Sequence, residues 1–160
     1  MTQPDVSELM VRGIVVGVFA ENCWVIGSRR TREGIVIDPG DQAEDILHLA
    51  KDMGLNVKLI ANSHAHIDHI LGVRGVQQAT NAKFLLHPQE LEIARGAAQA
   101  AQHMLGQPIE PPPDPDRLLA GYSDGESGVG ELYATEDRGD SWRRVDGEFP
   151  AVRSIWLEVA

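Results

Sequence analysis

One short segment of this chain concentrates side chains that bind metal ions, and it reads Ser63-His64-Ala65-His66-Ile67-Asp68-His69. Three histidines and one carboxylate fall within these seven residues. Neutral imidazole and carboxylate groups are ligands of first-row metal ions. A solvated loop that happens to be rich in histidine is the alternative. The close spacing and the apolar run before the segment favour a metal site.

The sequence on both sides predicts how this segment is held. Residues 57–61 form an apolar run typical of a short buried strand, so the segment follows a strand end. Ile70, Val73, Val76 and Ala79 continue at helical spacing, which places Asp68 and His69 near a helix start. A helix N-terminus holds the loop before it in a fixed geometry. In such a loop, His64 and His66 can face one site, while Asp68 and His69 face a neighbouring one.

The rest of the first 120 residues alternates between strand and helix patterns. Strands are predicted at 11–19, 22–28, 34–38 and 83–86, and helices at 42–53 and 89–104. The prolines between 108 and 115 cannot continue a helix and predict an extended surface linker. This order predicts an α/β layered domain.

The pattern His-x-His-x-Asp-His after a strand resembles the metal-binding signature of the metallo-β-lactamase-fold hydrolases. Residues 21–26 and 34–40, which end in Asp38-Pro39-Gly40, are similar to the early strands of the glyoxalase II-like (hydroxyacylglutathione hydrolase-like) branch. The similarity runs from about Val11 to Ala120. It implies the N-terminal part of an αββα sandwich, an α/β layered half that carries the ligand segment.

The resemblance also implies a chemistry. The family holds two divalent metal ions, which are zinc here or alternatively iron or manganese. His64 and His66 would bind the first ion, and Asp68 and His69 the second. Asp68 would also be the catalytic residue that orients the nucleophile. The implied reaction is attack of a metal-bound hydroxide on a small-molecule ester or thioester such as an acylglutathione.

Other residues allow more than one role. Asp38 resembles the carboxylate that orients one imidazole, and a turn-forming role before Pro-Gly is equally compatible with its position. The family completes its sites with later ligands, namely a histidine in a His-Thr-Pro-Gly-His-like segment, a bridging aspartate and a last histidine. The sequence does not show these. His87 and His103 are the remaining candidates, whereas His48 reads as a surface residue.

The sequence changes character after Ala120, and this predicts two parts, a partial metallo-β-lactamase-like domain at 1–120 and a β tail at 121–160. The tail contains no histidine. Residues 135–142 resemble the Asp-box of sialidase-like β-propellers, with Asp137 and Gly139 in the turn of a β-hairpin and Trp142 as its apolar plug. One copy of this box is less than a propeller needs.

Three hypotheses about function follow. The first is a metal-dependent hydrolase of the glyoxalase II-like type. The second is a truncated or fused gene product that keeps the ligand segment, binds metal weakly and is catalytically incomplete. The third is a propeller-type interaction module, which depends on the Asp-box alone. The sequence does not decide whether the chain is an active enzyme, because it does not show the downstream ligands of the family.

Composition narrows the partners and the location. The net charge of −10 argues against binding to nucleic acid or an anionic membrane surface. No run approaches the roughly 20 apolar residues that span a membrane. Cys23 is the only cysteine, so no intrachain disulfide forms. Because the first residues also lack a signal-peptide pattern, the sequence predicts a cytoplasmic protein. It does not indicate an oligomeric state.

Overall fold

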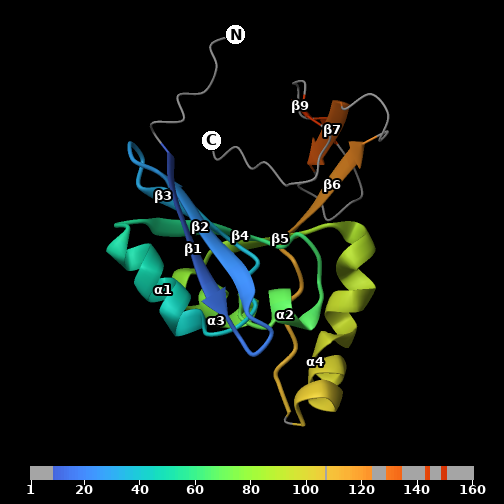
Figure 1. Cartoon of the computed structure of the whole chain (residues 1–160). Helices are drawn as coiled ribbons and strands as arrows, with labels where there is room; N and C mark the ends of the chain where they lie inside the picture. Colours follow the sequence, from blue (N-terminus) through green and yellow to red (C-terminus); the bar gives the residue numbers. More distant parts are fainter. Residues whose placement is uncertain (1–8, 107, 124–128, 135–142, 145–148, 151–160) are drawn as a thin grey trace.

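A computed structural model of the chain describes residues 9–106, 108–123, 129–134, 143–144 and 149–150 (Figure 1). The elements follow in this order: β1 Leu9–Val16, β2 Glu21–Ser28, β3 Glu33–Ile37, α1 Ala43–Asp52, β4 Asn56–Ala61, α2 Ile67–Ile70, α3 Val73–Thr80, β5 Lys83–Leu86, the 3-10 helix η2 Pro88–Glu90, α4 Leu91–Leu105, β6 Arg117–Ser123, β7 Val129–Ala134, β8 Arg143–Arg144 and β9 Phe149–Pro150. This mixed α/β architecture confirms the predicted fold class.

The strands form one sheet in the order β1-β2-β3-β4-β5-β6-β7-β8, and β9 also pairs with β7. The first three strands are antiparallel, β3 to β6 are parallel, and β6 and β7 are antiparallel again. Parallel neighbours need a crossover, and here α1, the α2–α3 pair and α4 provide the three crossovers. The carboxyl ends of β3, β4 and β5 therefore meet at one edge of the sheet.

One face of the sheet carries the main core. Alternate residues of β2, such as Cys23 and Val25, point to this face because successive side chains of a strand alternate. They pack with buried residues of each described α-helix, among them Ile46, Ile70 and Ala97. In Figure 1 these helices lie together on one side of β4 and β5.

The opposite face has a smaller apolar cluster. Ile35, Ala61 and Leu85 are buried there, and no described helix contributes to the cluster. The strand register continues this face across β1 and β2, where Trp24 is 44% exposed and Val11 is 52% exposed. The described part of the protein therefore covers one face of its sheet with helices and leaves apolar side chains exposed on the other.

The helix that the sequence predicts after the ligand segment is divided in two. Helix α2 ends at Ile70 and α3 begins at Val73, with Gly72 between them. The amide of Gly72 donates a hydrogen bond to the carbonyl oxygen of Pro39 (2.8 Å), and a Cβ at this position would lie only 2.7 Å from that oxygen. A glycine is therefore required where the loop after β3 packs against the α2–α3 junction.

The proline-rich segment is extended, as the sequence predicts, but it is not a free linker. The Nε of Arg74 donates to the carbonyl oxygen of Pro111 (2.7 Å), and Ile109 packs against the main core. The segment leads into β6, which pairs with β5 and continues beyond Ala120 to Ser123. The predicted boundary at residue 120 thus falls within a strand, and the division into two domains stays a prediction.

The predicted Asp-box residues, among them Asp137, Gly139 and Trp142, lie outside the described part of the chain. The strands on either side of them, β7 and β8, are antiparallel partners, with Ala134 opposite Arg143.

No described helix is both long enough and apolar enough to cross a membrane.

Asp116, at the end of the proline-rich segment, connects that segment to the sheet. Its Oδ2 accepts hydrogen bonds from the amide of Phe84 (2.9 Å) and from Nε2 of Gln77 (2.9 Å), and its Oδ1 accepts one from Nζ of Lys83 (3.0 Å). Burial acts to raise the pKa of Asp116, but these donors outweigh it and hold the pKa below its ordinary value.

Asp116→Asn is expected to lower the free energy of unfolding by about 1–3 kcal/mol at pH 7, because the part-buried amides of Phe84 and Gln77 lose a charged acceptor. The pKa is lower in the folded state, so this stabilisation is complete above the unfolded pKa of about 3.9 and is lost as the pH falls through the folded value. Urea unfolding at pH 7 and pH 3 checks this. Asp114→Asn, at an exposed carboxylate, is the control. An equal loss in both variants would contradict the prediction.

Candidate metal centre

The ligand segment leaves the carboxyl end of β4 and enters α2 at Ile67. His66 is exposed, whereas His64, Asp68 and His69 are half-buried. Loops at the carboxyl ends of parallel strands form the usual binding edge of such sheets. The predicted placement of the segment, after a strand and at a helix start, is therefore what the structure shows.

The structure brings the side chains of the segment together in pairs. The ring centroids of His64 and His66 lie 4.7 Å apart, and those of His64 and His69 lie 4.0 Å apart. The Nε2 of His69 is 3.5 Å from Oδ2 of Asp68. His64 thus lies between His66 on one side and the Asp68–His69 pair on the other.

Asp38 supports the segment from β3. It is 7% exposed, and its positive φ of 51° marks a turn that a non-glycine residue adopts only when other contacts hold it. Its Oδ1 accepts a hydrogen bond from the amide of Ser63 (2.7 Å), and its Oδ2 accepts one from the Ser63 hydroxyl (2.6 Å). Asp38 therefore both shapes the turn and fixes the start of the ligand segment.

This contact also determines how His64 is presented. The Ser63 hydroxyl lies 2.9 Å from Nδ1 of His64. Because its single proton is donated to the Asp38 carboxylate, the hydroxyl can only accept from His64, which places the imidazole proton on Nδ1. The Nε2 of His64 is then left with a free lone pair. Burial, followed by His69 and His66, lowers the pKa of His64 and favours the neutral form that binds metals.

Two further side chains hold the segment in place. Asn62 is fully buried, and its Nδ2 donates to the carbonyl oxygen of His69 (2.6 Å). The Oε2 of Glu90, from η2, accepts a hydrogen bond from the amide of Ala65 (2.9 Å). The loop is therefore anchored on several sides by residues from other elements.

Glu21 is a site residue that the sequence analysis missed. Its side chain is 7% exposed, and its Oε1 lies 3.6 Å from Nδ1 of His69. Burial raises the pKa of Glu21 to about 7, although His69 opposes the shift. The alternation of β2 contained a signal, because Glu21 is two residues before buried Cys23 and four before buried Val25. Its side chain thus falls on the inner face.

Glu21, Asp38 and His69 form the group of potential ligands that is most compact in the described residues, with ligand atoms all within 4.8 Å of one another. The predicted quartet of His64, His66, Asp68 and His69 is linked by the pairwise contacts above instead. Two buried atoms, Oε2 of Glu21 and Nδ1 of His69, have no hydrogen-bond partner. Unpaired polar atoms are costly in a protein interior, so these two mark the region beside the ligand segment as a site and not as ordinary core.

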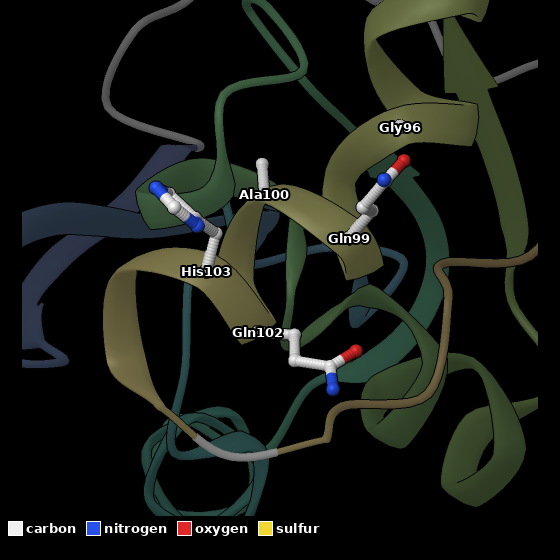
Figure 2. A pocket seen from close by; sticks show the side chains of 5 residues that line it. All are labelled: Gly96, Gln99, Ala100, Gln102 and His103. Atoms are coloured by element: carbon white, nitrogen blue, oxygen red, sulfur yellow. The ribbon is translucent and has the colours of Figure 1, made fainter.

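The two other candidate histidines are used differently. His87 caps η2, since its Nδ1 accepts a hydrogen bond from the amide of Gln89 (3.2 Å), and burial lowers its pKa. His103 is exposed near the end of α4, beside an open surface hollow that also includes Gln99 and Gln102 (Figure 2). Neither belongs to a group of three or more close ligands in the described structure. His48 is exposed on α1, as the sequence predicts.

The spacing of the donor atoms meets the requirements of a divalent ion. Two ligands of one tetrahedral zinc ion lie about 3.3 Å apart when each bond is about 2.0 Å long. The 3.5 Å between Nε2 of His69 and Oδ2 of Asp68 agrees with this spacing. A ligating histidine commonly donates its other N–H to a carboxylate or similar acceptor, and Nδ1 of His69 points toward Asp38 and Glu21. The residues present therefore fit a divalent metal ion.

Two proteins with similar sequences show what the chain resembles. A hydroxyacylglutathione hydrolase from Pseudomonas entomophila is 32% identical over 101 residues, which make up 61% of this chain and 39% of that protein. An uncharacterized protein from Aquifex aeolicus is 36% identical over 80 residues, 50% of this chain and 37% of that protein. The chain thus spans well under half the length of these relatives.

Solved structures show the same fold. The structure of TTHA1623 in a di-iron-bound form has a TM-score of 0.61 and 26% identity, covering 82% of this chain and 69% of that one. The B3 metallo-β-lactamase BLEG-1 has a TM-score of 0.58 and 23% identity, covering 78% and 67%. A model of the metallo-β-lactamase superfamily matches residues 16–141, well over half of the sequence. Together with the ligand loop, this match shows that the chain belongs to the metallo-β-lactamase superfamily.

Proposed function

We propose that this chain provides the metal-binding loop of a metal-dependent hydrolase of the glyoxalase II type, which cleaves a thioester such as an acylglutathione. The observation that carries the proposal is the arrangement of the ligand segment. Nε2 of His69 faces Oδ2 of Asp68, while its Nδ1 faces two buried carboxylates, and Nε2 of His64 is left free. The likeness to the Pseudomonas hydroxyacylglutathione hydrolase supports the thioester substrate.

Each ligand has a proposed role. His64 and His66 hold a first ion, and Asp68 and His69 hold a second. A bound zinc ion would lower the pKa of its water to about 7 and so supply a nucleophile at neutral pH. Asp68 orients that nucleophile, and the Asp38–Ser63 pair keeps the His64 ring in its ligating tautomer.

Zinc is the proposed metal, with iron or manganese as the alternatives. Imidazole and carboxylate ligands suit all three, and the di-iron form of the 26% identical neighbour favours iron as the first alternative. The proposed location is the cytoplasm, which agrees with a single cysteine, Cys23, that is buried and whose pKa burial raises.

Substituting both His64 and His66 by alanine is expected to remove the first metal ion, because that ion loses both of its proposed protein ligands. Metal content per chain, measured by mass spectrometry on purified protein, checks this. His48→Ala is the matched control, since it removes an exposed imidazole on α1. Full metal content in the double variant would show that this loop is not the site.

A catalytically incomplete metal-binding protein is the second candidate, and one observation favours it. In the described structure no third histidine joins His64 and His66 in a compact group of ligands, and the sequence after Ala120 contains no histidine. Catalytic zinc sites normally use three protein ligands. The second candidate therefore differs from the first in turnover and not in the site itself.

A further inference from the structure

Glu21 occupies an unusual environment for a carboxylate. It is the first residue of β2, and its side chain points to the inner face of the sheet. Although the side chain is only 7% exposed, its Oε2 has no hydrogen-bond partner among the described residues. Burying a carboxylate without full pairing is costly, so a purely structural role explains this residue poorly.

The group that Glu21 faces is the inner nitrogen of His69. Nδ1 of His69 is buried and lies 3.6 Å from Oε1 of Glu21 and 3.3 Å from Oδ2 of Asp38. The other ring nitrogen, Nε2, faces Oδ2 of Asp68 at 3.5 Å. The imidazole thus has two carboxyl groups on its inner side and a proposed fellow ligand on its outer side.

Asp38 is the nearer carboxylate to the inner nitrogen, but it also holds Ser63. Its two oxygens accept hydrogen bonds from the amide and the hydroxyl of Ser63 at 2.7 and 2.6 Å. Glu21 offers a second carboxyl group on the same side of the ring. Two carboxylates facing Nδ1 favour the tautomer with its proton there, and this leaves the lone pair on Nε2.

We propose that Glu21 is a positioning residue for metal binding: together with Asp38 it holds the Nδ1–H of His69 inward, so that Nε2 stays available to a divalent ion beside Asp68. This inference rests on the proposed function, since it assumes that His69 is a ligand. It assigns Glu21 an action through His69 and not on the metal or the substrate.

The first test uses the protein without metal. Two-bond proton–nitrogen NMR spectra of the imidazole rings report which nitrogen carries the proton. His69 of the unaltered protein is expected to be the Nδ1–H tautomer, and Glu21→Leu is expected to shift it toward a mixture with Nε2–H. Glu21→Gln keeps an acceptor oxygen and is expected to restore most of the Nδ1–H form. Glu44→Leu, at an exposed glutamate on α1, is expected to change nothing.

The second test measures zinc affinity by competition with a chromophoric chelator. Removing the partner of a metal-ligating histidine typically weakens binding about 10–100-fold, and this loss is expected for Glu21→Leu, with a smaller one for Glu21→Gln. The melting temperature of the metal-free Glu21→Leu protein is expected to equal or exceed that of the unaltered protein, because an apolar group replaces a poorly paired buried carboxyl group. If Glu21 had only a structural role, its substitution would lower the zinc affinity and the melting temperature together.

Other results would overturn the proposal. An unchanged His69 tautomer with unchanged zinc affinity would show that Glu21 does not act on the ring. Loss of one whole metal equivalent with unchanged affinity for the remainder would make Glu21 a ligand itself. If the unaltered protein binds no zinc, the proposed function fails, and the tautomer of His69 alone decides the role of Glu21.

Discussion

Gly40→Ala is expected to destabilise the fold by more than about 3 kcal/mol, because an overpacked side chain here meets backbone and not a movable side chain. A Cβ at Gly40 would lie 1.7 Å from the carbonyl oxygen of Asp68 and 2.7 Å from its carbonyl carbon. The loop after β3 or helix α2 must then move, and either shift displaces the proposed ligands. Urea unfolding measures the loss of stability.

Gly96→Ala is the matched control for this prediction. Gly96 is exposed in the middle of α4, and a Cβ there would meet no atom within 4 Å. The same substitution is expected to raise stability by about 0.5–1 kcal/mol, because alanine favours the helical backbone. Equal effects at the two positions would show that the approach between Gly40 and Asp68 does not constrain the fold.

The 160 residues, assayed as they stand, are expected to hydrolyse an acylglutathione thioester at close to the rate of a zinc-only blank, even with zinc added. A two-ion site needs a bridging nucleophile held between the ions, and the parts of such a site act together, so missing ligands cost orders of magnitude in rate. The identified donors are His64, His66, Asp68 and His69. Following thioester loss by absorbance, with zinc content measured on the same sample, checks the expectation.

Robust hydrolysis by the unaltered protein would contradict this expectation if it meets two conditions. The activity must be absent in Asp68→Ala. It must also be lost when metal is removed from the unaltered protein and return when zinc is added. It would mean that His87 and His103, or a second chain, complete the site. The comparison with Asp68→Ala is necessary because free zinc and traces of other esterases also cleave thioesters, and only a site-dependent rate can be attributed to this loop.

Local patterns in the sequence predict most of the elements correctly. The alternation that buries Cys23 and Val25 identifies β2, and the helical spacing of Ile46 and Ala50 identifies α1. These features depend on which side chains of one segment share a face, and the sequence records that directly. The position of the ligand segment at a strand end and a helix start was predictable for the same reason.

The features that sequence analysis missed depend on residues far apart in the chain. The break at Gly72 exists because the carbonyl of Pro39 reaches that point. Glu21 becomes part of the site because β2 and β3 place it beside His69. The proline-rich segment packs down because Arg74 reaches the carbonyl oxygen of Pro111. No local pattern contains these distances, so they become visible only in the folded chain.

The way the ligand segment is anchored also limits how it can be used in protein engineering. Its backbone is held by Asp38 before it and by Glu90 after it, together with Asn62 directly after β4. A synthetic peptide of residues 63–69 carries every proposed ligand but lacks most of these anchors, so it would have to order itself on binding and would lose affinity. A graft that keeps the preorganised geometry must transfer the scaffold from Glu21 to Glu90.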